Sequence, residues 1–162
     1  MKKILIHKPA MKIVGISART NNAAEMNPAT AKIGATVQEY FHRGLPEKIQ
    51  NRASPGTTYC IYTDYENDFQ GDYTYFIGEE VCSFNEMPKG LNSLTIPAQN
   101  YAQFTAGPGL MPGVCIEAWQ KIWQMAPEDL SGPRSYQADF EIYDDRAQDP
   151  QNVVLDICIG IK

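Results

Sequence analysis

The sequence carries the same order of structural elements twice, and this repeat limits the possible folds more than any other feature. Residues 12–20 predict a strand and residues 29–43 an amphipathic helix, and two strand-like stretches follow, TTYCIYTDY and YTYFIGEEVC. The second half has strand material in 91–106, broken at a proline, then a helix at 112–125 and the strands ADFEIYD and NVVLDICIGI. Both halves therefore predict the order strand, helix, strand, strand.

The two halves can also be aligned residue by residue. Offsets of 81 to 83 residues match identical residue types in corresponding elements: Ile33 with Ile116, Ile61-Tyr62 with Ile142-Tyr143, and Gly78 with Gly160. We therefore predict one domain, residues 1–162, with an internal repeat of about 11–84 and 91–162. Because each half has too little core to be stable alone, we expect a single α+β domain. It should have a pseudo-twofold antiparallel sheet, two helices on one face and a central cleft.

Side-chain alternation along the strands predicts which residues share a face of the sheet. One face of the last strand is continuously apolar, and we expect it to meet the helices: Val153, Leu155, Ile157, Ile159 and Ile161. The opposite face in the second half should carry Glu141, Tyr143, Asp156, Cys158 and Gly160. The repeat assigns the matching face of the first half to Cys60, Tyr62, Thr74, Phe76 and Gly78.

This second face should form a concave site between the halves. We expect aromatic walls from Tyr62, Phe76 and Tyr143 and a carboxylate from Glu141, with Asp156 as a further candidate. Aromatic rings attract cations, and an isolated carboxylate is costly to bury, so such a site favours a planar organic cation. The alternative interpretation is a solvated glutamate on the outer face of a sheet, with the aromatic side chains as ordinary packing.

Composition and motifs argue against several functions. The net charge of −5 and the lack of a basic recognition helix argue against nucleic-acid binding, and no stretch approaches the ~20 apolar residues of a membrane span. The four cysteines stand singly in apolar segments, as in reduced proteins, so we expect a cytoplasmic location. His7 and His42 have no partners at metal-ligand spacing, and phosphate- and dinucleotide-binding motifs are absent. We therefore expect neither a metal nor a cofactor.

Several short motifs together resemble one known family. FEIYDD, VGISART, EAWQKIW, YTDYENDFQGDYTYFIGEEV and DICIGIK resemble the GyrI-like, or AraC-type effector-binding, domain, including stand-alone members carried on integron cassettes. The resemblance covers nearly the whole chain and implies a duplicated fold with a cleft for lipophilic cations and drugs. It implies that Glu141 meets the cation and that Tyr62, Tyr143 and Trp119 surround it, with Trp123 as a further candidate. Both tryptophans also lie on the apolar side of their helix, so core packing remains an alternative for them.

The leading hypothesis is a non-enzymatic module that binds hydrophobic or cationic small molecules, in transcriptional regulation or in drug sensing or sequestration. One alternative is a hydrolase of electrophilic compounds in which Glu141 activates water, and another is an inhibitor that acts through protein contacts. Many relatives are fused to a DNA-binding domain, for which this chain has no room. A separate DNA-binding or target protein is therefore a candidate partner, while the natural ligand and the oligomeric state stay open.

Overall fold

The computed structural model describes residues 1–162 as one eight-stranded antiparallel sheet with five helices and one 3-10 turn. The strands are β1 (Lys2–Lys8), β2 (Met11–Thr20), β3 (Thr58–Thr63), β4 (Tyr73–Val81), β5 (Asn92–Ile96), β6 (Gln99–Gly109), β7 (Ala138–Tyr143) and β8 (Val153–Ile161). The helices are α1 (Asn22–Glu25), α2 (Ile33–His42), α3 (Leu45–Lys48), α4 (Gly113–Trp123) and α5 (Pro127–Leu130), and the 3-10 turn is η1 (Asp145–Ala147). The sheet order is β1-β6-β8-β7-β3-β4-β2-β5, and the predicted α+β class is confirmed.

The two longer helices follow from amphipathic sequence. In α4, Ala118, Trp119 and Ile122 lie on one side and are buried against the sheet, and the helix begins directly after Pro112. In α2, only Tyr40 is fully buried. No helix has the length and apolar character that crossing a membrane would require.

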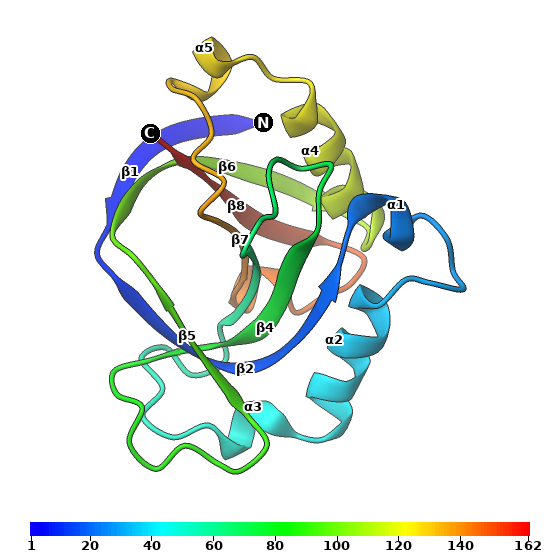
Figure 1. The fold of residues 1–162 in the computed structure, drawn as a ribbon. Coiled ribbons are helices and arrows are strands. Elements are labelled where there is room, and N and C mark those ends of the chain that lie inside the picture. Colours follow the sequence, from blue (N-terminus) through cyan, green and yellow to red (C-terminus); the bar gives the residue numbers. More distant parts are fainter.

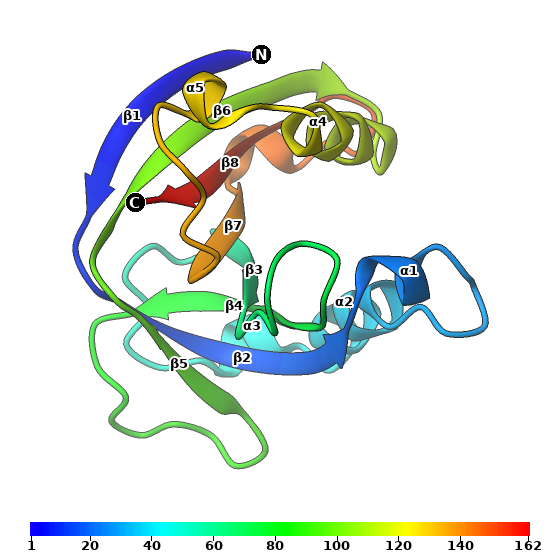
Figure 2. The same cartoon turned by 45° about the horizontal axis from the view of Figure 1, so that its top comes forward.

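The sheet is strongly curved (Figure 1, Figure 2), and its face away from the helices encloses a hydrophobic cluster of its own. This cluster joins Met11, Ile96 and Tyr101 from the outer strands to Ile61 and Phe140 from the central ones. Gly15 assists the curvature, because a side chain there would collide with the carbonyl oxygen of Ile77 on β4. The sheet therefore buries both of its faces.

The strand register has an approximate twofold relation centred on β3 and β7. Cys60 lies directly opposite Glu141 in this pair, so an axis between the two residues brings one strand onto the other. At the margins, β1 pairs with β6 while β5 pairs with β2, so the first strand of each half is joined to the second strand of the other half. The sequence repeat begins at about residue 11 and leaves β1 out. Duplication of an ancestral half stays a prediction.

The helices lie on the same face of the sheet as Glu141, and the opposite placement expected from the sequence was wrong. Glu141 lies opposite Ile157, which belongs to the apolar cluster beneath α4. The even-numbered residues of β8 had been expected beside Glu141, but their side chains point to the opposite face: Asp156, Cys158 and Gly160. The prediction assumed that helices cover the more apolar face of every strand. On β7, however, Phe140 fills the far face and Glu141 stands on the helix face.

The expected position of Phe76 in the cleft was also wrong. Tyr75 lies opposite Tyr62 and Ile77 opposite Cys60, so these residues of β4 face the helices. Phe76 lies opposite Ile61 and packs in the cluster on the far side of the sheet. The stretch YTYFI is largely aromatic or apolar on both faces, so alternation alone could not fix which of its residues point toward the helices.

Candidate ligand-binding site

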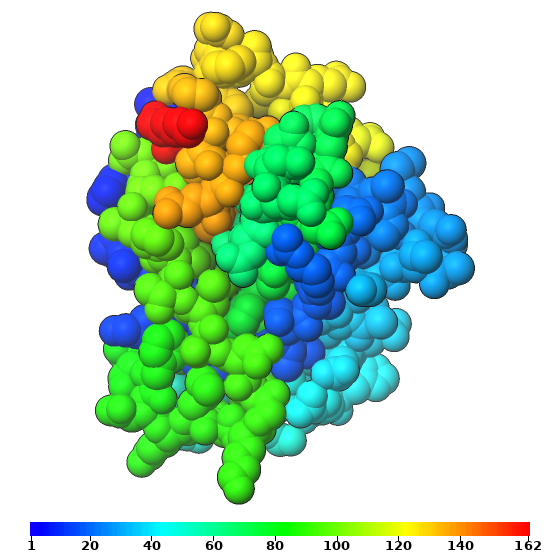
Figure 3. Space-filling model, viewed as in Figure 1, coloured from blue at the N-terminus to red at the C-terminus, as the bar shows by residue number.

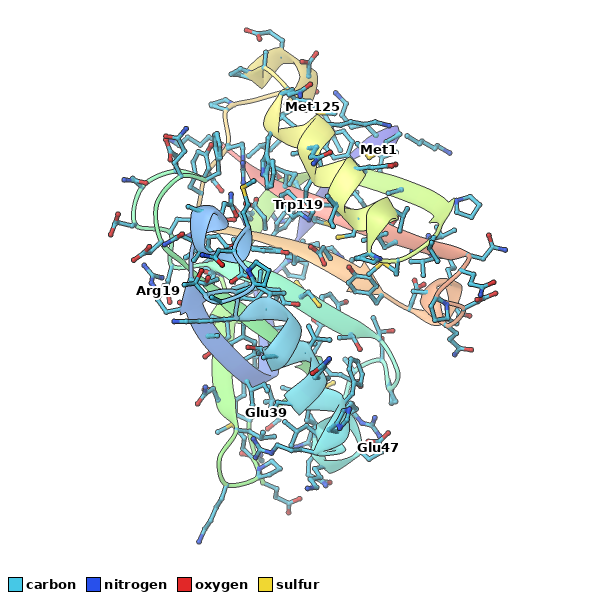
Figure 4. The ribbon with its side chains drawn as sticks, turned by 90° about the vertical axis from the view of Figure 1, so that its right-hand side faces the viewer. Met1, Arg19, Glu39, Glu47, Trp119 and Met125 are labelled. Atoms are coloured by element: carbon cyan, nitrogen blue, oxygen red, sulfur yellow. The ribbon has the colours of Figure 1, made fainter.

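A cavity of about 930 Å³ lies between α2 and α4, over the central strands. Small-molecule sites usually occupy ~300–1,000 Å³ and are mostly apolar, as this one is. Figure 4 faces this side of the molecule, with α4 above α2 and Trp119 directed from α4 toward the strands. The lining includes Ile33, Gly34, Val37, Phe41, Cys115, Ile116, Trp119 and Trp123 from the helices, and Cys60, Tyr62, Tyr73, Tyr75, Glu141 and Tyr143 from the strands.

Three carboxylates line the cavity, from Glu25, Glu141 and Asp144, and only Glu141 is buried. Its side chain comes from the middle of β7 and is only 3% exposed. Oε2 accepts hydrogen bonds from the Tyr62 hydroxyl at 2.7 Å and from the Trp119 indole nitrogen at 2.7 Å, and Oε1 accepts one from the Tyr143 hydroxyl at 2.6 Å. Three neutral donors on β3, α4 and β7 therefore fix the carboxylate in one orientation.

The charge of Glu141 has no counter-ion within the protein. None of the ion pairs in the structure includes this residue. Arg134 also lines the cavity, but its guanidinium is held by Asp139 at 2.6 Å. A buried carboxylate normally has a paired cation because desolvation disfavours an isolated charge. The site is consequently suited to a positively charged ligand.

The groups around Glu141 stay neutral. Burial raises the pKa of the Tyr62 and Tyr143 hydroxyls well above the usual range, and the Glu141 charge raises it further. Both tyrosines therefore remain hydrogen-bond donors at neutral pH. Burial, again followed by the Glu141 charge, also raises the pKa of the Cys60 and Cys115 thiols. Since the thiolate is the reactive form, neither cysteine is activated as a nucleophile.

Aromatic rings form much of the wall next to Glu141. The Tyr62 ring makes edge contacts with Trp119 at 5.1 Å and with Tyr73 and Tyr75 at 5.4 Å between ring centroids. In each of these contacts the edge of one ring meets the face of another, an arrangement that aromatic pairs prefer and that stabilises the wall. The arrangement offers π faces close to a fixed negative charge.

The loop at 64–72 borders the cavity on one side. Figure 3 shows this segment, in green, next to the orange segment of the chain. Tyr65 meets the edge of Tyr136 at 5.6 Å, and Phe69 lies nearly parallel to Trp123 at 6.4 Å. Trp123 is 40% exposed, so it belongs to the rim and not to the floor.

Five of the six residues predicted for the site line the cavity: Tyr62, Trp119, Trp123, Glu141 and Tyr143. Their role in binding stays a prediction. Phe76 does not line the cavity, as described above. Trp119 combines the two alternatives left open for it, because it packs in the core cluster under α4 and also donates to Glu141.

Asp156 was the second carboxylate considered for the site, and it lies elsewhere. It accepts hydrogen bonds from the Thr105 hydroxyl at 2.7 Å and from the Arg146 guanidinium at 2.7 Å, away from the cavity. Sequence reasoning missed Tyr73 and Tyr75, which line the wall. The alternating tyrosines of DYTYF were a usable signal, but they were assigned to the wrong face.

Comparison with known proteins gives a consistent picture. The profile of a family described as "Cass2: Integron-associated effector binding protein" matches residues 5–161. The curated "Putative transcriptional regulator protein YobU" of Bacillus subtilis (strain 168) is 27% identical over 158 residues, which cover 98% of this chain and 96% of YobU.

Two solved structures share the fold along nearly the whole chain. The integron cassette protein VCH_CASS2, from the mobile metagenome of Vibrio cholerae, has a TM-score of 0.79 at 26% identity and covers 99% of this chain and 95% of its own. The structure of SAV2435 bound to tetraphenylphosphonium has a TM-score of 0.78 at 18% identity, with 100% and 94% covered. At that identity the second likeness shows the fold alone.

Proposed function

The chain belongs to the family of Cass2 integron-associated effector-binding proteins, and on this premise we propose that it binds lipophilic cations that carry aromatic groups. The positive charge of the ligand would lie beside Glu141, and its rings would pack against the aromatic wall. The proposed role is ligand sensing or sequestration without chemical conversion of the ligand.

The observation that carries this proposal is the unpaired charge of Glu141. The carboxylate is almost completely buried and accepts three hydrogen bonds, all from neutral groups. A cation in the cavity would supply the missing counter-charge in a place with little water, where electrostatic attraction is stronger than at the surface. The faces of the neighbouring rings would add cation–π attraction.

The relatives support the proposed ligand class and setting. The structure of SAV2435 has tetraphenylphosphonium bound to the same fold, although its sequence identity is low. YobU is named as a transcriptional regulator. We therefore propose that ligand binding here serves regulation or drug sequestration, with a separate DNA-binding or target protein as the partner in the regulatory case.

The proposal is tested with a cation and a neutral compound of the same shape, 1-methyl-4-phenylpyridinium and 4-methylbiphenyl. Isothermal titration should give tighter binding of the cation to the natural chain. Glu141→Gln keeps the side-chain size and removes the charge, and it should weaken cation binding about 10- to 100-fold, as expected for a hydrogen-bonded charged contact. Binding of 4-methylbiphenyl should change less than threefold, on the order of a few tenths of a kcal/mol.

Glu117→Gln provides the matched control, because Glu117 is an exposed residue of α4 outside the cavity. It should bind both compounds like the natural chain. Equal weakening of the cation and the neutral compound by Glu141→Gln would remove the electrostatic basis of the proposal. Failure of the natural chain to bind any cationic aromatic compound would remove the proposal as a whole.

Hydrolysis with Glu141 as general base is the alternative function. A general base must hold a water molecule next to the substrate. The hydrogen bonds from Tyr62, Trp119 and Tyr143 take three of the roughly four acceptor positions of the Glu141 carboxylate, which leaves one position on Oε1 for a water molecule. This restriction favours binding over hydrolysis. Turnover of an electrophilic ester that is lost in Glu141→Gln while binding persists would support the hydrolase. A tight protein complex that is insensitive to substitutions in the cavity would instead support a protein-interaction inhibitor.

A further inference from the structure

The two helices present corresponding positions to the cavity. Four of the five lining residues of α2 pair with the lining residues of α4 at a constant offset of 82: Ile33 with Cys115, Gly34 with Ile116, Val37 with Trp119, and Phe41 with Trp123. The fifth, Gln38, corresponds to Gln120, which does not line the cavity. The buried positions of the two helices correspond at the same offset, since Tyr40 is 0% exposed and its counterpart Ile122 is 1% exposed. The sequence alignment of the helices had used 83, which pairs buried Tyr40 with the exposed rim residue Trp123. The corrected pairing lets the two sides of the cavity be compared position by position.

At two of these positions the α2 side carries much smaller residues. Gly34 stands where α4 has Ile116, and Val37 stands where α4 has Trp119. A β-carbon placed on Gly34 would meet no atom within 4 Å, so the space in front of this residue is open. On the other side, Trp119 is only 7% exposed and packs into the core cluster with Leu155 and Ile157.

The two helices also differ in how many of their residues are buried, and α2 again has the looser packing. α4 buries Ala118, Trp119 and Ile122, whereas α2 buries only Tyr40. Ile33 and Val37 are partly exposed on the apolar side of α2 and line the cavity. Apolar side chains of a helix are normally covered by protein. Both helices leave rim residues uncovered, Phe41 on α2 and Ile116 and Trp123 on α4, but α2 has a smaller fully buried set than α4.

Two of the three hydrogen bonds to Glu141 come from the α4 half of the chain, and the third comes from Tyr62 on β3 in the α2 half. Trp119 donates to Oε2 from α4 and covers the carboxylate there, and Tyr143 donates to Oε1 from the same half of the chain. In the α2 half, Cys60 takes the position directly opposite Glu141, and Tyr73 and Tyr75 continue the wall toward Val37. A group next to the carboxylate on that side meets a small thiol and tyrosine rings.

We propose that the cavity is functionally one-sided, so that the aromatic body of the ligand occupies the space against α2 while its cationic centre lies beside Glu141. Gly34 and Val37 are then the residues that set the width of the ligand. The ligands are bulky lipophilic cations with several rings around or beside one charge. This inference rests on the proposed function and adds the placement and size limit of the ligand.

The test is substitution of Gly34 by the residue that α4 has at the corresponding position, Gly34→Ile. The helix should tolerate the change, because glycine is a weaker helix former than isoleucine and the new side chain enters open space. Binding of bulky tetraphenylphosphonium should weaken about tenfold or more through steric conflict, while slim 1-methyl-4-phenylpyridinium should change less than about threefold. Ala35→Ile is the matched control, since Ala35 is the next residue of α2, is exposed and does not line the cavity.

A second measurement locates the ligand without a substitution. Nuclear Overhauser contacts from the aryl protons of tetraphenylphosphonium should reach the methyl groups of Ile33 and Val37 and be absent from Ile116. Contacts to Ile116 without contacts to Val37 would overturn the inference, as would equal weakening of both cations by Gly34→Ile. Either of these results would leave the charge dependence on Glu141 intact, so failure of this inference is distinguishable from failure of the proposed function.

Discussion

Asp139 and Glu141 lie two residues apart on the same face of β7, and both are buried, at 0% and 3% exposure. Each accepts a hydrogen bond from a tyrosine hydroxyl. Asp139 also receives the Arg134 guanidinium at 2.6 Å and the Gly160 backbone N–H at 2.8 Å. Glu141 receives no cation.

The difference separates a structural carboxylate from one that is available to a ligand. Asp139 is neutralised inside the protein and connects the segment before β7 to the end of β8 through Arg134 and Gly160. Glu141 is almost equally buried, lines a large cavity with aromatic walls, and has no cation partner within the protein. Burial alone is thus no indication of function, and the missing counter-ion is what distinguishes Glu141.

The largest expected effect is on the paired carboxylate. Asp139→Asn should lower the free energy of unfolding by about 3–5 kcal/mol, because it leaves the Arg134 charge buried without a partner. Urea denaturation measures this change. The double variant Arg134→Met with Asp139→Asn should recover part of the loss. A loss below about 1 kcal/mol in the single variant would show that the pair is not structural.

The next largest effect is the rise in the free energy of unfolding caused by ligand, which should depend on Glu141. At a tetraphenylphosphonium concentration one hundred times its Kd, the free energy of unfolding of the natural chain should rise by about 2.7 kcal/mol. In Glu141→Gln, a tenfold weaker affinity reduces the rise at the same concentration to about 1.4 kcal/mol. Thermal unfolding with and without ligand gives both values. An undiminished rise in Glu141→Gln would mean that the cation does not use this carboxylate.

A pH dependence follows from two of the three tyrosines that donate hydrogen bonds to Asp139 and Glu141. Burial raises the pKa of Tyr65 and Tyr143 in the folded protein, and the charges of Asp139 and Glu141 raise it further. Above about pH 10 the unfolded chain loses these protons while the folded chain keeps them. Stability is therefore fully present below pH 10 and falls above it, by about 1.4 kcal/mol per pH unit for each tyrosine.

Tyr143→Phe should reduce the slope of this decline by the contribution of one tyrosine, about 1.4 kcal/mol per pH unit. Urea denaturation at pH 9, 10 and 11 measures the slope. Tyr65→Phe should reduce the slope similarly; each of the two substitutions also removes a hydrogen-bond donor, to Glu141 in Tyr143→Phe and to Asp139 in Tyr65→Phe. An unchanged slope in Tyr143→Phe would indicate that this hydroxyl ionises normally in the folded protein.

The smallest expected effect is the change in stability caused by substitution of Glu141. Glu141→Gln should change the free energy of unfolding by no more than about 1 kcal/mol, with an increase being the expected sign, because an uncompensated charge is removed. The same type of substitution at Asp139 is strongly destabilising, so the pair of variants measures the contrast directly. A loss of several kcal/mol in Glu141→Gln would place Glu141 with Asp139 as a structural group.

Sequence patterns were sufficient for the class of fold and for part of the site. The alternation in ADFEIYD put Glu141 and Tyr143 on one face, and the repeat added Tyr62 from the matching strand; all three meet in the structure. The strand β1 was not predicted, because MKKILIHK carries charges at both ends and a short apolar centre that is half exposed.

The side of the sheet on which the site lies could not be predicted. Both faces of this sheet are buried, one under helices and the other against its own outer strands. The residues around Phe76 are consequently apolar on both faces of the strand, so their pattern does not indicate which face meets the helices. The register of β7 against β8, which sets Glu141 opposite Ile157, depends on contacts between strands and is not encoded in either strand alone.

The most direct test of the unpaired charge is a crystal structure of the chain with tetraphenylphosphonium. The charged centre of the ligand should lie next to the Glu141 carboxylate, within the ~6 Å over which an opposite charge acts strongly. At least one phenyl group should lie against Val37. A ligand bound with its charge turned to solvent, or outside the space between α2 and α4, would contradict the assignment of Glu141 as the counter-charge.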